Sequence, residues 1–225
     1  CALNETTILA RTNAQLAILQ GFCAERNIAY KLLGKDNFWK RPEVLALLGL
    51  VRNVIGHDDG SLKRVIQSPL PCVKFLRKEA AVDALESLQA GTLNGADGEP
   101  QPLKRLLRLV DTGDHRQNEI LHELGRIIDG AQQHANTPHQ LVDYLANKTG
   151  ARTLGEEDED LNADNFVQDN VQKVVTMAKA FSNLSDFLKF ARTAGHPSRK
   201  QTRLILSTVH GFKGKEAKNV FVIGV

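Results

Sequence analysis

The sequence predicts an α/β protein in which a partial parallel sheet is interrupted by a large all-α insertion, so that the chain is predominantly helical. Strand-like apolar runs lie only toward the two ends, at 6–10, at 30–33 and from 204 onward. Between them, apolar residues recur at three- and four-residue spacing, which is the period of one helix face. Strands at both ends with helices between them indicate one α/β domain that is split by a helical insertion.

The first part of the chain alternates between the two kinds of pattern. It predicts strand, helix, strand and helix over 6–10, 13–25, 30–33 and 42–55. Proline suits the first turn of a helix because its φ is already helical and no N–H is needed there, so Pro42 is expected to begin the second helix. Asn13 is a candidate cap for the first helix.

The middle of the chain is predicted to be nearly all helix. The helical period recurs in six windows, at 72–88, 103–110, 119–128, 139–145, 166–181 and 184–190. Breaks are expected where Gly, Pro and Asp are dense, at 91–102, 111–114 and 155–164. The acidic run 156–160 is interpreted as a solvated loop. From Gln201 the pattern returns to strand, loop and strand.

Composition is that of an ordinary globular chain, with 225 residues, 42% hydrophobic and 24% charged. Cys1, Cys23 and Cys72 lie far apart and form no C-x-x-C pair, so neither a disulfide framework nor a metal site is predicted. No apolar stretch approaches the roughly 20 residues of a membrane helix. We therefore expect a cytoplasmic protein with no membrane partner.

Charge is distributed unevenly although the net charge is only +3. Residues 1–55 hold seven Lys and Arg against four Asp and Glu, and residues 195–225 hold six against one. The stretch between them has 16 basic and 21 acidic residues. Basic ends and an acidic middle indicate a polyanion-binding domain with an insertion of different character, although a chance partition of surface charge would look the same.

A polar cluster lies near the C-terminal end, between two strand-like runs, where an α/β sheet would hold a ligand at its strand ends. The cluster resembles the T-x-H-x-x-K-G-x-E segment that is motif V of UvrD/Rep-type superfamily 1 DNA helicases. Five residues are in register with that motif, namely Thr208, His210, Lys213, Gly214 and Glu216.

Three further segments resemble the same family, in the family's order. Residues 8–15 are similar to motif IV, an apolar strand that ends in R-T-N-A-Q before a helix. Residues 28–30 and 38–44 are similar to the segments I-P-Y and F-F-x-R-x-E-I. The resemblance covers nearly the whole chain.

The resemblance implies a RecA-like second motor domain of the P-loop NTPase type. Residues 1–55 would form its first half, 56–197 a helical accessory subdomain, and 198–225 an incomplete second part. The sequence contains no G-x-x-x-x-G-K-[ST] phosphate loop, no D-E-x-x pair after an apolar strand and no arginine motif VI. Since the chain also begins with Cys1 and ends in a strand-like run, we expect it to be part of a longer protein and to be unable to hydrolyse ATP by itself.

Nucleotide contacts are assigned through the resemblance. It implies that Arg11 is the catalytic arginine of motif IV, which reaches the γ-phosphate of ATP bound on the opposite motor domain; a surface ion pair is the alternative. It further implies that Glu216 accepts a hydrogen bond from the ribose. Gly214 would let the backbone approach the nucleotide closely.

DNA contacts follow from the same motifs. The resemblance implies that Thr208, His210 and Lys213 meet the backbone of single-stranded DNA. Phe38, Trp39 and Arg41 combine aromatic faces with a cation, a composition suited to stacking on bases and holding phosphates. The alternatives are that Phe38 or Trp39 is a core residue and that Arg41 caps the following helix.

Two places depart from the family pattern. In motif V, Lys215 and Ala217 replace Leu and Phe, and Gly211 and Phe212 replace a small pair, which puts the packing of the nucleotide pocket in doubt. In the accessory subdomain, the family often has a P-x-R-G-I-G turn that grips duplex DNA. The comparable residues 68–74 lack those glycines, so duplex binding by this turn is not predicted.

The sequence thus predicts the C-terminal part of an ATP-dependent DNA helicase or translocase, moving 3′ to 5′ on single-stranded DNA in DNA repair or replication. ATP and Mg²⁺ would bind the full-length enzyme and not this chain alone. Expected partners are single-stranded DNA or a single-strand/duplex junction, the phosphate-loop motor domain of the same protein, and proteins that dock on the insertion. Localisation would be bacterial-type and nucleoid-associated. The alternative is a non-catalytic nucleic-acid- or protein-binding module that retains the helicase fold.

Overall fold

The computed structural model describes residues 2–26, 28–33, 38–56, 60–92, 107–154, 164–194 and 204–224. Contacts divide the chain into two compact units. The sheet unit comprises Cys1–Arg41 and Ser185–Val225, and the helical unit comprises Pro42–Leu184. The chain therefore leaves the sheet unit once and returns to it, as an insertion requires.

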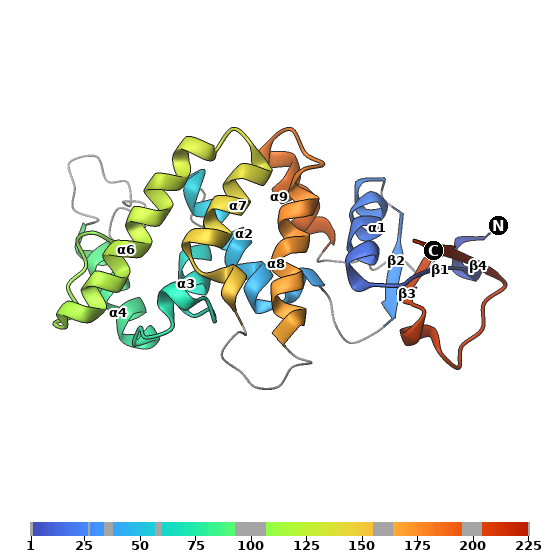
Figure 1. Cartoon of the computed structure of the whole chain (residues 1–225), viewed down its shortest axis with the longest axis horizontal. Coiled ribbons are helices and arrows are strands. Elements are labelled where there is room, and N and C mark those ends of the chain that lie inside the picture. Colours follow the sequence, from blue (N-terminus) through green and yellow to red (C-terminus); the bar gives the residue numbers. More distant parts are fainter. Residues whose placement is uncertain are drawn as a thin grey trace. The chain divides into compact units, whose positions relative to one another are not determined.

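The sheet unit contains four parallel strands in the order β2-β3-β1-β4 (Figure 1). Their bounds are Thr6–Ala10 for β1, Tyr30–Leu33 for β2, Leu204–Thr208 for β3 and Asn219–Ile223 for β4. The inner strand β1 pairs with β3 on one side and with β4 on the other, and both of these strands come from the other end of the chain. The predicted α/β class is confirmed, and the strand bounds at 6–10 and 30–33 agree with the prediction.

Helix α1, at Asn13–Glu25, follows β1 in this unit. Helix α9, at Leu184–Ala194, precedes β3, and its first residue lies at the boundary between the units. The core of the sheet unit joins apolar side chains of α1 to the strands, including Leu16, Cys23 and Leu206. Tyr30 of β2 donates a hydrogen bond from its hydroxyl to the Ala194 carbonyl at 2.8 Å, and burial raises the pKa of Tyr30. The last turn of α9 is thereby attached to the sheet.

The helical unit is built around α2, which spans Pro42–Val54 and contacts α3, α6, α7 and α8. Nearly all of its residues are buried, as expected for a helix that is apolar on every side. The other α-helices that the structure describes in this unit are α3 at Ser61–Ile66, α4 at Lys78–Thr92, α6 at His115–Ala131, α7 at Pro138–Lys148 and α8 at Asp164–Ala178. Pro42 is the first residue of α2, as the sequence predicts.

The contacts group α2 with the helical unit and nearly all of α9 with the sheet unit, whereas the sequence analysis divided the chain after residues 55 and 197. That three-part assignment stays a prediction. In the window 72–88, the helix begins only at Lys78, because residues 71–77 form a 3-10 turn and a bend. The break at 111–114 is confirmed, but the acidic run 156–160 and most of the other two breaks lie outside the described residues.

Two further expectations concern absences. Among the residues that the structure describes, no helix has the length and apolar character needed to cross a membrane. Within the same ranges, no group of three or more His, Cys, Asp or Glu side chains is arranged to hold a metal ion.

Candidate functional site

The segments that resemble motif IV and motif V lie side by side at the carboxyl ends of β1 and β3. Ala10 ends β1 and pairs in register with Thr208, which ends β3. Directly beyond the strands, the N–H of Val209 donates to the Ala10 carbonyl at 3.0 Å. Since parallel strands present their carboxyl ends at the same edge, the segments that begin at Arg11 and at Val209 leave the sheet side by side.

The segment after β1 is held by a capping box. Gln15 N donates to the Thr12 hydroxyl at 3.4 Å, and Gln15 Oε1 accepts from the N–H groups of Thr12 at 3.2 Å and Arg11 at 3.0 Å. Such reciprocal bonds pair the N-cap residue with the third helical residue. The expectation that Asn13 caps α1 is wrong, because Thr12 does so, and the T-x-x-Q spacing was the overlooked signal.

Arg11 itself is exposed beyond the end of β1. Within the described residues, its guanidinium makes no hydrogen bond or ion pair; the alternative of a surface ion pair therefore has no support here. An exposed guanidinium at a strand end, without a partner among the described residues, is available to bind phosphate oxygens.

The segment after β3 forms a 3-10 turn, η6, at His210–Phe212. The Gly211 N–H in this turn donates a hydrogen bond to Thr208 Oγ1 at 3.0 Å. A Cβ on Gly211 would lie 3.0 Å from that oxygen and 3.1 Å from Ser207 Oγ, so a small residue suits this position. Phe212, a departure from the family pattern, is buried with 8% of its surface exposed.

A type II turn follows at once. Lys213 has φ −51° and ψ 130°, Gly214 has φ +76°, and Lys215 N donates to the Phe212 carbonyl at 3.0 Å. This turn needs φ above zero at its third residue, which favours glycine. A Cβ on Gly214 would meet no atom within 4 Å, so glycine is favoured here by the backbone conformation and not by a lack of space. His210 and Lys213 are both exposed on these two turns.

Glu216 lies in the connection from η6 to β4. β4 begins with Asn219, which pairs with Thr6 at the amino end of β1, and the neighbouring Lys218 forms a 2.5 Å ion pair with Glu5. The connection therefore runs from the carboxyl edge of the sheet toward its amino edge. Strand register brings Arg11 and Thr208 together but does not bring Glu216 beside them.

The two aromatic candidates for DNA binding are buried. Phe38 and Trp39 are 1% and 2% exposed, and Trp39 packs edge-on against Phe38 at 5.1 Å and against Phe190 of α9 at 5.4 Å between ring centroids. Neither ring offers a face on which a base could stack, so their assignment as DNA-binding residues is not supported. The burial favours the core alternative that the sequence left open. Arg41 lies just before α2 and is half-buried.

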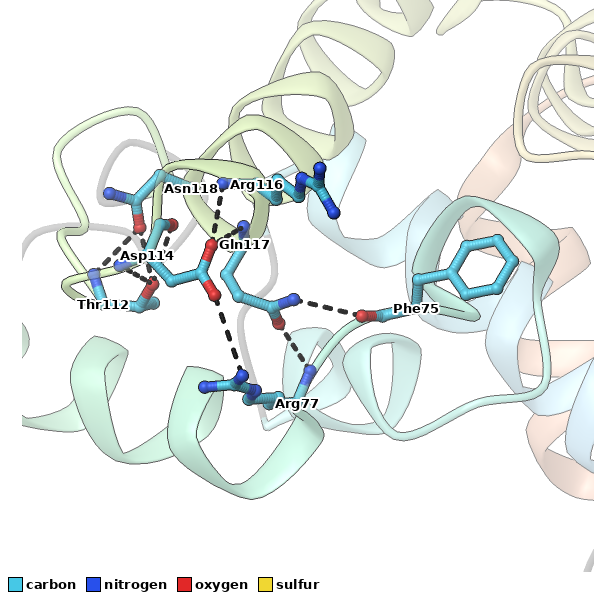
Figure 2. Close-up of polar contacts among 7 residues, drawn as sticks. All are labelled: Phe75, Arg77, Thr112, Asp114, Arg116, Gln117 and Asn118. Atoms are coloured by element: carbon cyan, nitrogen blue, oxygen red, sulfur yellow. Dashed lines mark hydrogen bonds and ion pairs between the residues drawn. The ribbon is translucent and has the colours of Figure 1, made fainter.

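The turn at 75–77, directly after the residues 68–74 that are comparable to the family's duplex-binding loop, is hydrogen-bonded to α6 (Figure 2). Gln117 of α6 donates to the Phe75 carbonyl at 3.1 Å and accepts from Arg77 N at 2.6 Å. Phe75 itself is 78% exposed. No sequence pattern indicates this role of Gln117, because the two bonds span about 40 positions of the chain.

The base of this turn is fixed by the start of α6. Asp114 caps the helix by accepting from Arg116 N at 2.9 Å and Gln117 N at 3.4 Å, and it lies 3.9 Å from the Arg77 guanidinium (Figure 2). Asn118 Oδ1 accepts from the N–H and the hydroxyl of Thr112, both at 2.8 Å.

Comparison with known proteins agrees with the motifs. Residues 1–94 match the model of the UvrD-like helicase C-terminal domain. DNA helicase II of Escherichia coli (strain K12) is 26% identical over 238 residues, covering 100% of this chain and 32% of that protein. The ATP-dependent DNA helicase PcrA of Staphylococcus aureus (strain Mu50) is 24% identical, covering 98% of this chain and 31% of its own length. The chain thus spans about a third of the curated relatives that it matches.

Proposed function

We propose that this chain, which is distantly homologous over its full length to the C-terminal region of DNA helicase II and PcrA, forms the second motor part of an ATP-dependent DNA helicase. The observation that carries the proposal is the junction of the two motif segments. They lie about 200 positions apart in the chain, yet they leave neighbouring strands at one sheet edge, joined by the bond from Val209 N to the Ala10 carbonyl.

Arg11 would act on the nucleotide. ATP and Mg²⁺ would be held by a phosphate-loop domain elsewhere in the full-length protein, and ATP would supply the phosphoryl group that is transferred to water. The exposed guanidinium of Arg11 has no competing partner among the described residues. It would close on the γ-phosphate and stabilise the charge that develops during transfer.

The turns after β3 would bind single-stranded DNA. His210 and Lys213 stand exposed on two consecutive tight turns, whose backbone is fixed by the Thr208 hydroxyl and by the φ of Gly214. Short, rigid turns hold cations in place at little entropic cost when a phosphate binds. Closure of the two motor domains on ATP and their opening after hydrolysis would tighten and loosen these DNA contacts in turn, so that the protein moves 3′ to 5′ along the strand.

The remaining contacts belong to the same proposal. Glu216 would bind the ribose and Arg41 a DNA phosphate, while the helical unit would offer a surface to protein partners and to the duplex side of a junction. The exposed position of Glu216 in a connection without a helix leaves it accessible to a ligand.

The test is ATP hydrolysis stimulated by single-stranded DNA, measured on the full-length protein that contains this sequence and on this chain alone. We expect turnover only in the first. Arg11→Ala in the full-length protein is expected to lower stimulated turnover about a thousandfold or more while sparing DNA binding. Lys31→Ala, which removes another exposed charge of the sheet unit, is the matched control. Unchanged turnover of Arg11→Ala would refute the assigned role.

The second candidate is a binding module that retains the fold without the motor. It predicts that the full-length protein binds single-stranded DNA and hydrolyses no ATP. The presence of both Arg11 and Glu216 disfavours this candidate, since a module that binds only nucleic acid needs neither residue for contact with a nucleotide.

A further inference from the structure

We infer that Gln15 is a positioning residue for Arg11, an inference that rests on the role proposed for Arg11 above. The starting observation is that the Gln15 side chain makes one bond more than a capping box needs. Its Oε1 accepts from the N–H of the cap residue Thr12 at 3.2 Å, and it also accepts from Arg11 N at 3.0 Å. A capping box requires only the first of these bonds.

The additional bond restrains the backbone of Arg11 at the point where β1 ends. Arg11 and Thr12 are both exposed, so their side chains are not held in a core. A single acceptor that binds two successive N–H groups sets the direction in which the chain leaves the strand. The direction of the Arg11 side chain depends on the same backbone, and catalysis by an arginine depends strongly on placement.

The end of β4 provides the space for this amide. Gly224 follows β4 directly and has φ +70°. A Cβ on Gly224 would lie 1.9 Å from Gln15 Nε2 and 2.7 Å from Gln15 Cδ, closer than any real contact. The amide of Gln15 therefore fills the position beside Gly224 and lies between the carboxyl ends of β1 and β4, which pair in register at Ala10 and Ile223.

This arrangement assigns Gln15 a function beyond the start of α1. The Gln15 side chain contacts Gly224 at the end of β4 and accepts hydrogen bonds from the backbone that follows β1. It thereby ties the position of Arg11 to the sheet. Loss of the acceptor is expected to misplace a group that acts in the transition state. The result should be a lower kcat with little change in KM for ATP.

The first experiment compares three variants of the full-length protein by single-strand-stimulated ATP hydrolysis. Gln15→Leu keeps the size of the side chain and removes the acceptor, and we expect kcat to fall about tenfold or more. Gln15→Glu keeps an acceptor and is expected to restore kcat to within about threefold. Thr12→Ala is the control, because it breaks the other half of the capping box and leaves the Gln15 acceptor intact; we expect its kcat within about twofold of wild type. Thermal melting of each variant verifies folding.

A double-mutant cycle tests whether Gln15 acts through Arg11. If it does, Arg11→Ala combined with Gln15→Leu is no slower than Arg11→Ala alone. Equal losses in Gln15→Leu and Thr12→Ala, or multiplicative losses in the double variant, would overturn the inference and leave the role of Arg11 standing. Unchanged turnover in Arg11→Ala would instead overturn the proposed function and this inference with it.

Gly224→Ala provides a second route to the same result. The added Cβ displaces the Gln15 amide without changing Gln15 or Arg11, so we expect the same loss of kcat as in Gln15→Leu. Gly60→Ala is the matched control, since Gly60 also has a positive φ, at 79°, but its Cβ would meet no atom within 4 Å. A Gly224→Ala protein that is folded and fully active would contradict the proposal that the Gln15 amide beside Gly224 positions Arg11.

Discussion

Asn170 of α8 donates a hydrogen bond from Nδ2 to Glu43 Oε1 of α2 at 2.9 Å, and the two residues are only 2% and 6% exposed. Glu43 is the acidic residue of the segment that resembles F-F-x-R-x-E-I. Its carboxylate lies in the first turn of α2, where the helix dipole favours negative charge. In this chain the residue therefore has a structural role, which is to connect two buried helices of the helical unit.

Asn170→Ala is expected to destabilise the protein, because it leaves a buried carboxylate without its donor. Removing one partner of a buried bond to a charged group costs about 2–3 kcal/mol in the free energy of unfolding. Chemical denaturation measures this difference. Gln140→Ala, an exposed change on the neighbouring helix α7, is the control and should stay within about 0.5 kcal/mol. Equal values for the two variants would show that the Glu43 bond contributes nothing.

Two substitutions of Asp114 distinguish the contribution of its helix cap to stability from that of its ion pair with Arg77 (Figure 2). Asp114→Ala removes both and should lower the free energy of unfolding by about 1 kcal/mol. Asp114→Asn retains a capping oxygen and loses only the 3.9 Å pair with Arg77, so a change below about 0.5 kcal/mol is expected, since exposed pairs contribute little. Urea denaturation of both variants decides between the two effects, and a large loss in Asp114→Asn would contradict the assignment to the cap.

Gly214→Ala is expected to strain the type II turn, because φ is +76° there. The cost is about 1–2 kcal/mol for a residue with a Cβ, and less for Asn, which tolerates this region. Since the site has open space, no collision adds to the cost. Affinity for single-stranded DNA, measured by fluorescence anisotropy on the full-length protein, should therefore fall in Gly214→Ala and recover partly in Gly214→Asn. A lower affinity in Gly214→Asn than in Gly214→Ala would indicate that the size of the side chain, and not the backbone conformation, limits this position.

Lys213→Ala is expected to weaken single-strand binding through the loss of one phosphate contact. The slope of log K against log salt should decrease in magnitude by about 0.7, the value for one charge on a single strand. Lys179→Ala, which removes an exposed charge of the helical unit, is the control. An unchanged slope in Lys213→Ala would exclude a phosphate contact by this residue.

Local patterns determined a large part of this structure. The strands at 6–10 and 30–33, the start of α2 at Pro42 and the positive φ of Gly214 follow from side-chain period, from the geometry of proline and from the freedom of glycine. The motifs themselves also contain the family resemblance, because each motif is a short run of the chain. These properties depend on residues that are neighbours in sequence.

Tertiary structure decided the rest, because the partners lie far apart in the chain. The pairing of β1 with β3 and β4, the bond between Glu43 and Asn170 and the contact of Gln15 with Gly224 each join positions more than 100 residues apart. The burial of Trp39 likewise depends on Phe190 of α9. A sequence pattern specifies which side chains need a partner or a core, but only the packed chain determines which distant residue provides it.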